Sequence, residues 1–259
     1  DLHYRERATA AEAGLAADER HTLPRIVPGH EFSARFLEAG PNTECAFKPG
    51  DRLAPLPFTH SAHAPNGVEV IGLSPKYSGG LATLSLADAA RAFAIPDAVP
   101  SDLAALTEPL AVGLHAANLA TRNRGPNVVI GCGPVGLAVI FALLRQGRGP
   151  ILAADFSPER RAAAEALGAD IALDPAETSP FSRWDDLGFD PHPSSPLLER
   201  DFRGLPSGVN IFDCVGVPGL LDQIVKNAPQ HSHVITVGVC AHEDKLTPRE
   251  AIVTELTLE

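Results

Sequence analysis

The second half of the chain alternates short apolar runs with longer segments of helical periodicity. The apolar runs predict strands in NVVIGCG, PILAADF, DIALD, VNIFDCVG and HVITVGVC, with ELTLE as a sixth. Between them, PVGLAVIFALLRQG and SPERRAAAEALGA predict helices, the second with Ser157 as N-cap and Pro158 at its first position. Strands that alternate with helices are typical of an α/β fold whose parallel sheet is covered by helices.

The first half has a different pattern. Residues 25–58 contain short apolar runs separated by PGH, GPN and PGD, which predicts a β-rich unit with turns at these positions. The polar, Gly- and Pro-containing residues 59–80 predict a loop. Helical periodicity then begins at Ser101, a candidate N-cap, and Pro109 is predicted to break or kink that helical region.

The change of pattern predicts two domains, a β-rich domain over 1–105 and a parallel-sheet domain over 106–259. Within the second, the Pro- and Ser-rich residues 176–208 predict an irregular insertion that is partly helical around Trp184. The chain contains no methionine and begins and ends abruptly. We therefore expect it to be part of a longer protein that is truncated at both ends.

Composition narrows the function classes. The chain of 259 residues is 44% hydrophobic and 20% charged, with a net charge of −11. This acidic balance argues against a nucleic-acid partner, and no apolar run is long enough to predict a membrane span. The four cysteines form no CxxC pair, which argues against a structural zinc knuckle or a disulfide scaffold and favours a reducing, cytoplasmic setting.

The segment GCGPVG carries the most informative local motif, with glycines at 131, 133 and 136. Gly131 allows a tight turn, Gly133 lets the backbone approach a pyrophosphate, and Gly136 lets the following helix pack against the strand. The helix N-terminus then presents free N–H groups and a positive dipole end to the phosphates. A strand–turn–helix without a ligand is the alternative, but the preceding strand and following helix favour a dinucleotide.

Asp155 ends the next predicted strand, where a carboxylate accepts hydrogen bonds from both ribose hydroxyls of a dinucleotide. A carboxylate repels a 2′-phosphate, so NAD is favoured over NADP. Arg160 and Arg161 weaken this argument for NAD, unless both simply face solvent on the following helix. The glycines of DCVG (213–216) and VGVC (237–240) follow later strands, at the sheet edge where cofactors bind.

The segment VPGHEF places His30 and Glu31 side by side after Gly29. Imidazole and carboxylate are both zinc ligands, and a glycine allows the backbone to bend so that adjacent side chains reach one ion. Most His-Glu pairs in loops are simply solvated, so these residues alone give a weak metal signal and an ordinary turn is the default interpretation.

The chain resembles the zinc-type medium-chain dehydrogenases/reductases, the alcohol and polyol dehydrogenase group. The resemblance covers nearly the whole chain and rests on pieces in the family's order: DLH (1–3), GHE (29–31), KPGDRLAPLP (48–57), GG (79–80), IPDAV (95–99), EPLAVGLHA (108–116), GCGPVG (131–136), DFSPERR (155–161), DCVG, VGVC and ELTL. It implies a Rossmann-type, doubly wound NAD-binding domain preceded by a GroES-like, β-rich catalytic domain, both incomplete here.

The resemblance also implies the site. His30 is a zinc ligand, Glu31 a ligand or exchangeable neighbour, and Glu108 of EPLA a further ligand or a group close to the metal. His3 falls at the proton-relay position, so His3, Glu31 and Glu108 are the catalytic candidates. The family's cysteine ligand would precede Asp1. The implied cofactor-binding residues are Gly131, Gly133, Pro134, Val135, Gly136, Asp155, Arg160, Val215, Gly216 and Val239.

The implied reaction is hydride transfer between an alcohol and NAD, with zinc as a Lewis acid. The family's four-cysteine lobe is absent, so we expect one catalytic zinc and no structural zinc. Two alternatives remain: a zinc-independent NAD(P)H enone or quinone reductase of the same superfamily, and a catalytically silent nucleotide-binding relative. The expected partners are a small alcohol or carbonyl substrate and further copies of the chain in a homodimer or homotetramer.

Overall fold

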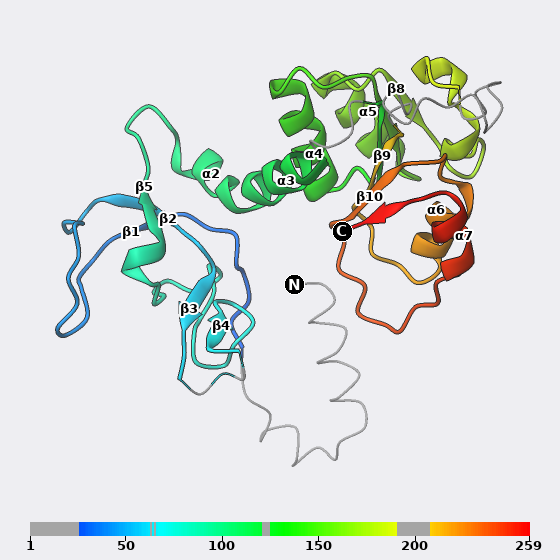
Figure 1. Cartoon of the computed structure of the whole chain (residues 1–259). Coiled ribbons are helices and arrows are strands. Elements are labelled where there is room, and N and C mark those ends of the chain that lie inside the picture. The colour runs from blue at the N-terminus through cyan, green and yellow to red at the C-terminus, as the bar shows by residue number, and fades with distance from the viewer. Residues whose placement is uncertain (1–25, 63, 65, 121–124, 191–207) are drawn as a thin grey trace, which may run out of the picture. The chain divides into compact units, whose positions relative to one another are not determined.

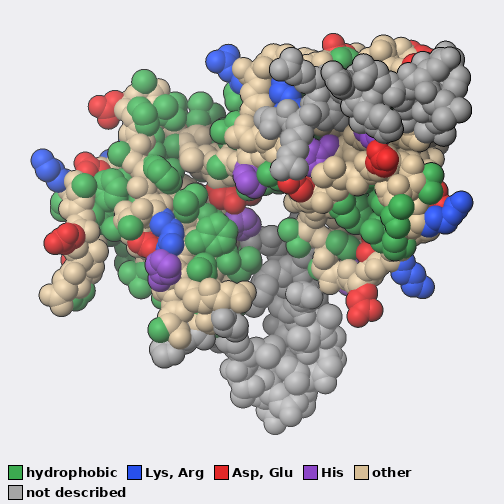
Figure 2. All heavy atoms as spheres, in the orientation of Figure 1, with side chains coloured by type: hydrophobic (Ala, Val, Ile, Leu, Met, Phe, Trp, Pro, Cys, Tyr) green, Lys and Arg blue, Asp and Glu red, His purple; other side chains and the backbone are tan. Residues whose placement is uncertain are grey.

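The computed structural model describes residues 26–62, 64, 66–120, 125–190 and 208–259. The chain divides into two compact units between Glu108 and Pro109, close to the expected boundary after residue 105. Figure 1 shows strands in both units and most of the helices in the second. On the face seen in Figure 2, the Lys and Arg side chains of the described residues are scattered and do not gather in one patch.

The described part of the second unit contains a six-stranded parallel sheet with the order β11-β10-β9-β6-β7-β8. Read from β8, this is the strand order 3-2-1-4-5-6 of a doubly wound dinucleotide-binding sheet. The predicted strands are confirmed, including ELTLE as the sixth. Their bounds are β6 (Asn127–Ile130), β7 (Ile151–Ala154), β8 (Ile171–Leu173), β9 (Asn210–Asp213), β10 (His233–Thr236) and β11 (Thr257–Leu258).

Helices cover both faces of this sheet, because alternate strand residues point to opposite sides. Val129, Ala153 and Phe212 pack with α3 (Thr107–Leu119), α4 (Pro134–Arg145) and α5 (Pro158–Leu167). Val128, Leu152 and Ile211 pack on the other face with α6 (Leu220–Asn227) and with Trp184. The helix α7 (Pro248–Val253) lies beside α6. The predicted α/β class with a parallel, helix-covered sheet is therefore confirmed.

Two local predictions of helical structure can be compared with the structure. Ser157 caps α5 by accepting a hydrogen bond from the backbone N–H of Arg160, as predicted. The insertion is partly helical around the buried Trp184, as predicted, in the 3₁₀ turns η4 (Pro180–Ser182) and η5 (Asp185–Leu187). Residues 191–207 of the insertion lie outside the described residues.

The prediction for Ser101 is wrong. Pro100 is the N-cap residue of α2 (Ser101–Ala104), and the Ser101 hydroxyl instead accepts from the Arg52 guanidinium at 3.3 Å. The helical region is interrupted after α2, and Pro109 lies in the first turn of α3. A first-turn proline needs no intrahelical N–H bond, so the helix continues through it.

The first unit contains an antiparallel sheet of order β1-β2-β5, formed by β1 (Ala34–Arg35), β2 (Arg52–Pro55) and β5 (Ala92–Ala94), with the 3₁₀ turn η2 (Ala89–Arg91) before β5. Strands β3 (Phe58–His60) and β4 (Val68–Val70) pair as a hairpin. The loop predicted for 59–80 is thus partly wrong. The valines of β4 alternate with Glu69, and the Glu69 carboxylate accepts a hydrogen bond from Ser61 across the hairpin. The polar composition of this segment gave no sign of this hairpin.

Candidate functional site

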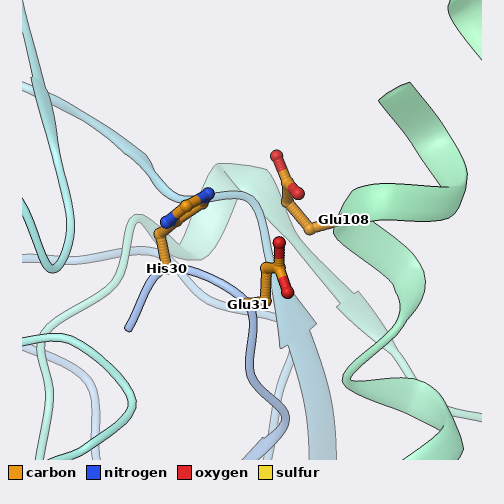
Figure 3. A group of neighbouring side chains, drawn as sticks. All are labelled: His30, Glu31 and Glu108. Atoms are coloured by element: carbon orange, nitrogen blue, oxygen red, sulfur yellow. The ribbon is translucent and has the colours of Figure 1, made fainter. Parts of the chain in front are cut away.

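Three side chains converge at the start of α3 and the VPGHEF turn. Figure 3 shows the imidazole of His30 and the carboxylates of Glu31 and Glu108 pointing toward one another. One ligand atom from each lies within 4.8 Å of the others. Glu31 is exposed, whereas His30 and Glu108 are half-buried. The structure therefore brings together the three residues that the sequence assigns to a metal.

Backbone packing holds the turn that carries His30 and Glu31. Gly29 has a φ of +104°, a left-handed conformation that glycine adopts without strain. Gly79 N–H donates to the Val27 carbonyl at 2.8 Å, and Gly80 N–H donates to the Gly29 carbonyl at 2.7 Å. A Cβ at residue 79 would lie 2.2 Å from the Gly29 oxygen. The GG pair is thus needed because a second backbone segment lies directly on the turn.

The donor set fits a zinc ion. Zinc binds imidazole nitrogen and carboxylate oxygen at about 2.0–2.2 Å, which puts tetrahedral ligand atoms about 3.4 Å apart. The three atoms lie within 4.8 Å of one another, so they would have to move closer together to bind one ion. Burial raises the pKa of Glu108, the neighbouring Glu31 raises it further, and His30 opposes the shift. A divalent cation between the carboxylates would remove this mutual repulsion. His3, the proposed proton relay, lies outside the described residues.

The glycine turn after β6 has the geometry expected of a phosphate-binding loop. Gly131 has a φ of +90°. A Cβ at residue 136 would lie 1.8 Å from the Gly131 oxygen, so only glycine lets α4 start this close to the strand. A Cβ at Gly133 would meet nothing within 4 Å. Open space beside Gly133 is what a pyrophosphate requires. Pro134 and Val135 follow in the first turn of α4, the first exposed and the second half-buried.

Asp155 is 8% exposed at the end of β7. Its Oδ2 accepts from the Cys132 N–H and its Oδ1 from the Ser157 N–H, both at 2.8 Å. Sequence reasoning missed these two bonds, which tie Asp155 to the glycine turn. A carboxylate has about four lone-pair sites, so capacity remains for ribose hydroxyls.

The two arginines after Asp155 differ. Arg160 is 57% exposed and approaches the Asp155 carboxylate to 3.6 Å. Arg161 donates to the Asp155 and Phe156 carbonyls, both at 2.8 Å, and to Asp174 at 2.9 Å. Arg161 therefore fixes the loop, and the suggestion that both arginines simply face solvent is wrong.

The loops after β9 and β10 meet beside the glycine turn. A Cβ at Gly131 would lie 2.6 Å from Val215 Cγ2, and one at Gly216 would lie 2.6 Å from the Gly238 backbone. Val239 is 75% exposed. Sequence reasoning missed Asp213, whose Oδ1 accepts from the Val215 and Gly216 N–H groups at 2.9 and 3.1 Å. The aspartate of DCVG thus shapes this loop, and its place at a strand end was the available signal.

The two cysteines beside this turn are poor nucleophiles. Burial raises the pKa of Cys132 to about 12, with a further contribution from Asp155. Burial, followed by Asp213, also raises the pKa of Cys214. Thiols held protonated in this way pack as small apolar groups.

Comparison with known proteins places the chain in a family. The family described as "Zinc-binding dehydrogenase" matches residues 134–259, within the second unit. The (R,R)-butanediol dehydrogenase of Bacillus subtilis is 30% identical over 256 residues, which cover 95% of this chain and 69% of the relative. The chain belongs to the zinc-type medium-chain dehydrogenases/reductases. Galactitol 1-phosphate 5-dehydrogenase of Escherichia coli is 29% identical over 257 residues, covering 92% of this chain and 68% of the relative.

The solved structures agree with this family assignment. Galactitol-1-phosphate dehydrogenase from Escherichia coli matches with a TM-score of 0.72 and 25% identity, over 94% of this chain and 71% of that one. This member of the zinc-type family is therefore an alcohol dehydrogenase-like oxidoreductase with a Rossmann-like unit and a β-rich region. Among its described residues, no helix is both long and apolar enough to cross a membrane.

Proposed function

We propose that this oxidoreductase transfers hydride between an alcohol and NAD, with one zinc ion held by His30, Glu31 and Glu108. The observation that carries the proposal is the convergence of these three side chains, which come from two segments far apart in the sequence. The relatives are named for vicinal-diol and sugar-alcohol-phosphate substrates, which supports a small polyhydroxy alcohol as the substrate class. The open side of Gly133 and the carboxylate of Asp155 support NAD as the second substrate.

The chain's own residues supply positioning and electrostatics. His30, Glu31 and Glu108 would hold the metal, which when bound supplies Lewis acidity toward an alcohol or carbonyl oxygen. Gly133 and the first turn of α4 bind the pyrophosphate through backbone N–H groups. Asp155 orients the adenosine ribose, and Arg161 holds the loop that carries Asp155. Val215, Gly216 and Val239 line the strand ends on the nicotinamide side.

A direct spectrophotometric assay of NADH formation tests this function. The full-length protein is incubated with NAD and a panel of diols and sugar alcohols, and NADH formation is followed by absorbance. We expect activity that is lost after dialysis against a zinc chelator and restored by added zinc. Activity that survives chelation and prefers NADPH with an enone or quinone would instead support the zinc-independent reductase. No turnover with any substrate, despite bound nucleotide, would support a catalytically silent relative.

Asp155 is expected to set the preference for NAD. An Asp155→Asn variant keeps one oxygen acceptor but removes the charge that repels a 2′-phosphate, and Arg160 at 3.6 Å becomes free to pair with that phosphate. One charge contact of this kind is worth about 1.4 kcal/mol, so kcat/KM for NADP relative to NAD should rise at least about tenfold. The exposed Asp185→Asn is the matched control and should leave the ratio unchanged. An unchanged ratio in Asp155→Asn would remove this residue from cofactor selection.

The sheet edge supports a proposal on assembly. Strand β11 lies at the end of the six-stranded sheet and both of its residues are exposed. Among the described residues no strand pairs with the outer edge of β11, and a second copy can extend such an edge. We therefore propose a homodimer or homotetramer, and light scattering after size exclusion that gives only the monomer mass would contradict it.

A further inference from the structure

We propose that Glu69 is a positioning residue for the metal site: its carboxylate organises the segment that clamps the VPGHEF turn and thereby sets the zinc affinity of His30 and Glu31. This inference rests on the proposed function for the metal itself. Glu69 touches none of the three candidate ligands in any contact described above. Its influence would pass through the segment from Gly72 to Gly80.

The first link is the hydrogen bonding of the Glu69 carboxylate. The Ser61 hydroxyl donates to Oε1 at 2.7 Å, the Ser74 hydroxyl donates to Oε2, and Lys76 Nζ donates to Oε1 at 3.1 Å. The Glu69 side chain is 14% exposed, whereas Lys76 is 52% exposed. The bonds from Ser74 and then Ser61 lower the pKa of Glu69 to about 2, so it stays an ionised acceptor throughout the neutral range.

The second link is the turn that Ser74 closes. Ser74 pairs with Tyr77 as an isolated antiparallel bridge, and Gly72 N–H donates to the Tyr77 carbonyl at 2.9 Å. The Ser74 hydroxyl also accepts from the Lys76 N–H at 3.2 Å. Glu69 therefore anchors Ser74, whose hydroxyl bonds to the Lys76 N–H inside this short turn and whose backbone pairs with Tyr77. Loss of that anchor would free Gly72 to shift.

The third link is close backbone contact with the metal-site turn. A Cβ at Gly72 would lie 2.7 Å from the Gly29 oxygen, and Gly79 and Gly80 donate to the carbonyls of Val27 and Gly29. Contacts this tight leave no free space in which a shift could be absorbed. Movement of the 72–80 segment would therefore move the residue immediately before His30. Hydrogen-bonded partners outside a metal's ligand shell typically change metal affinity by about 10–100-fold.

A purely structural role for Glu69 predicts a different outcome. If Glu69 only stabilises the β3–β4 hairpin, its loss lowers the melting temperature but leaves the folded fraction with unchanged zinc affinity. Two measurements on folded protein separate the roles. One is the zinc dissociation constant, from competition with a chromogenic chelator. The other is the hydrogen-exchange rate of the Gly79 and Gly80 amides in metal-free protein, which reports the clamp without any metal.

The experiment uses full-length Glu69→Gln, with the exposed Glu44→Gln as matched control because the Glu44 carboxylate makes no hydrogen bond or ion pair among the described residues. Glutamine keeps the shape but presents an amide donor to a hydroxyl or ammonium group that needs an acceptor. We expect zinc binding about 10–100-fold weaker and faster exchange at Gly79 and Gly80. Glu44→Gln should match the unmodified protein in both. Ser74→Ala removes one of the bonds to Glu69 and should show a smaller loss of zinc affinity and a smaller rise in exchange rate. This variant replaces Glu69→Gln in the test if Glu69→Gln does not fold.

The outcomes separate the two proposals. Zinc in the unmodified protein, with unchanged affinity and exchange in folded Glu69→Gln, would overturn the positioning role alone. When Glu69→Gln does not fold, unchanged values in Ser74→Ala overturn it equally. Absence of zinc from the unmodified protein would overturn the proposed function first.

Discussion

Replacing His30 with alanine is expected to remove zinc from the protein and abolish alcohol oxidation. His30 supplies the only nitrogen donor of the cluster, and Glu31 and Glu108 would then be two like charges without a neutral ligand between them. Zinc favours nitrogen and sulfur donors over a purely carboxylate set. Because residues outside the ligand shell already cost about 10–100-fold, loss of a ligand should reduce activity by more than about 100-fold. Elemental mass spectrometry and the NADH assay measure the two effects.

His60→Ala provides the control for this substitution. His60 lies in the same unit, is exposed, and its ring contacts Arg91 at 2.9 Å rather than any candidate ligand. Its zinc content and kcat should match those of the unmodified protein. A His30→Ala protein that retains zinc and turnover would show that the metal, if present, binds elsewhere.

The second large effect is expected at Gly133, where alanine should impair NAD binding without unfolding the protein. Gly133 has a φ of −70°, which alanine adopts readily, and its Cβ would enter open space. The cost to folding at this helix N-cap should not exceed about 1 kcal/mol. The same methyl group would occupy the approach of a pyrophosphate, so the dissociation constant for NAD should rise at least about tenfold. Calorimetric titration with NAD and a thermal melt measure both quantities.

Gly136→Ala is the contrasting variant on the same turn. Its Cβ would lie 1.8 Å from the Gly131 oxygen, which is backbone and cannot rotate away. Overpacking of this kind typically costs about 1–3 kcal/mol, and a clash with backbone lies at the upper end or beyond. We therefore expect a lower melting temperature for Gly136→Ala but not for Gly133→Ala. Equal NAD affinity in Gly133→Ala and the unmodified protein would contradict the phosphate-binding role of this loop.

Much of the second unit could be predicted from sequence because its strands β6, β7 and β9 are buried along their whole length. Such strands are nearly continuous apolar runs, and Gly131 and Asp155 follow directly after β6 and β7. The helix signals were equally local, as at Ser157 and Pro158. Local signals failed at Ser101, where the serine hydroxyl bonds to Arg52 from a distant segment instead of capping its own helix.

The residues of the candidate site could be predicted from the sequence, but the surrounding contacts that hold them in place could not. His30 and Glu31 are adjacent, and a family resemblance was needed to join Glu108 to them. The backbone contacts that hold their turn could not be predicted from the sequence. They come from Gly72, Gly79 and Gly80, which lie in a segment whose composition predicts a polar loop. The bonds of Glu69 to Ser61 and Ser74 likewise join residues with no periodic pattern. Polar contacts of this kind leave no signature in composition or hydrophobic spacing.

The most direct test of the account is the zinc content of the full-length protein, purified without chelator and measured by elemental mass spectrometry. The account predicts about one zinc per chain, held by His30, Glu31 and Glu108 together with a further ligand. About two zinc ions per chain would contradict the single-site proposal. No zinc, in protein that still binds NAD, would contradict the metal site and make VPGHEF an ordinary turn.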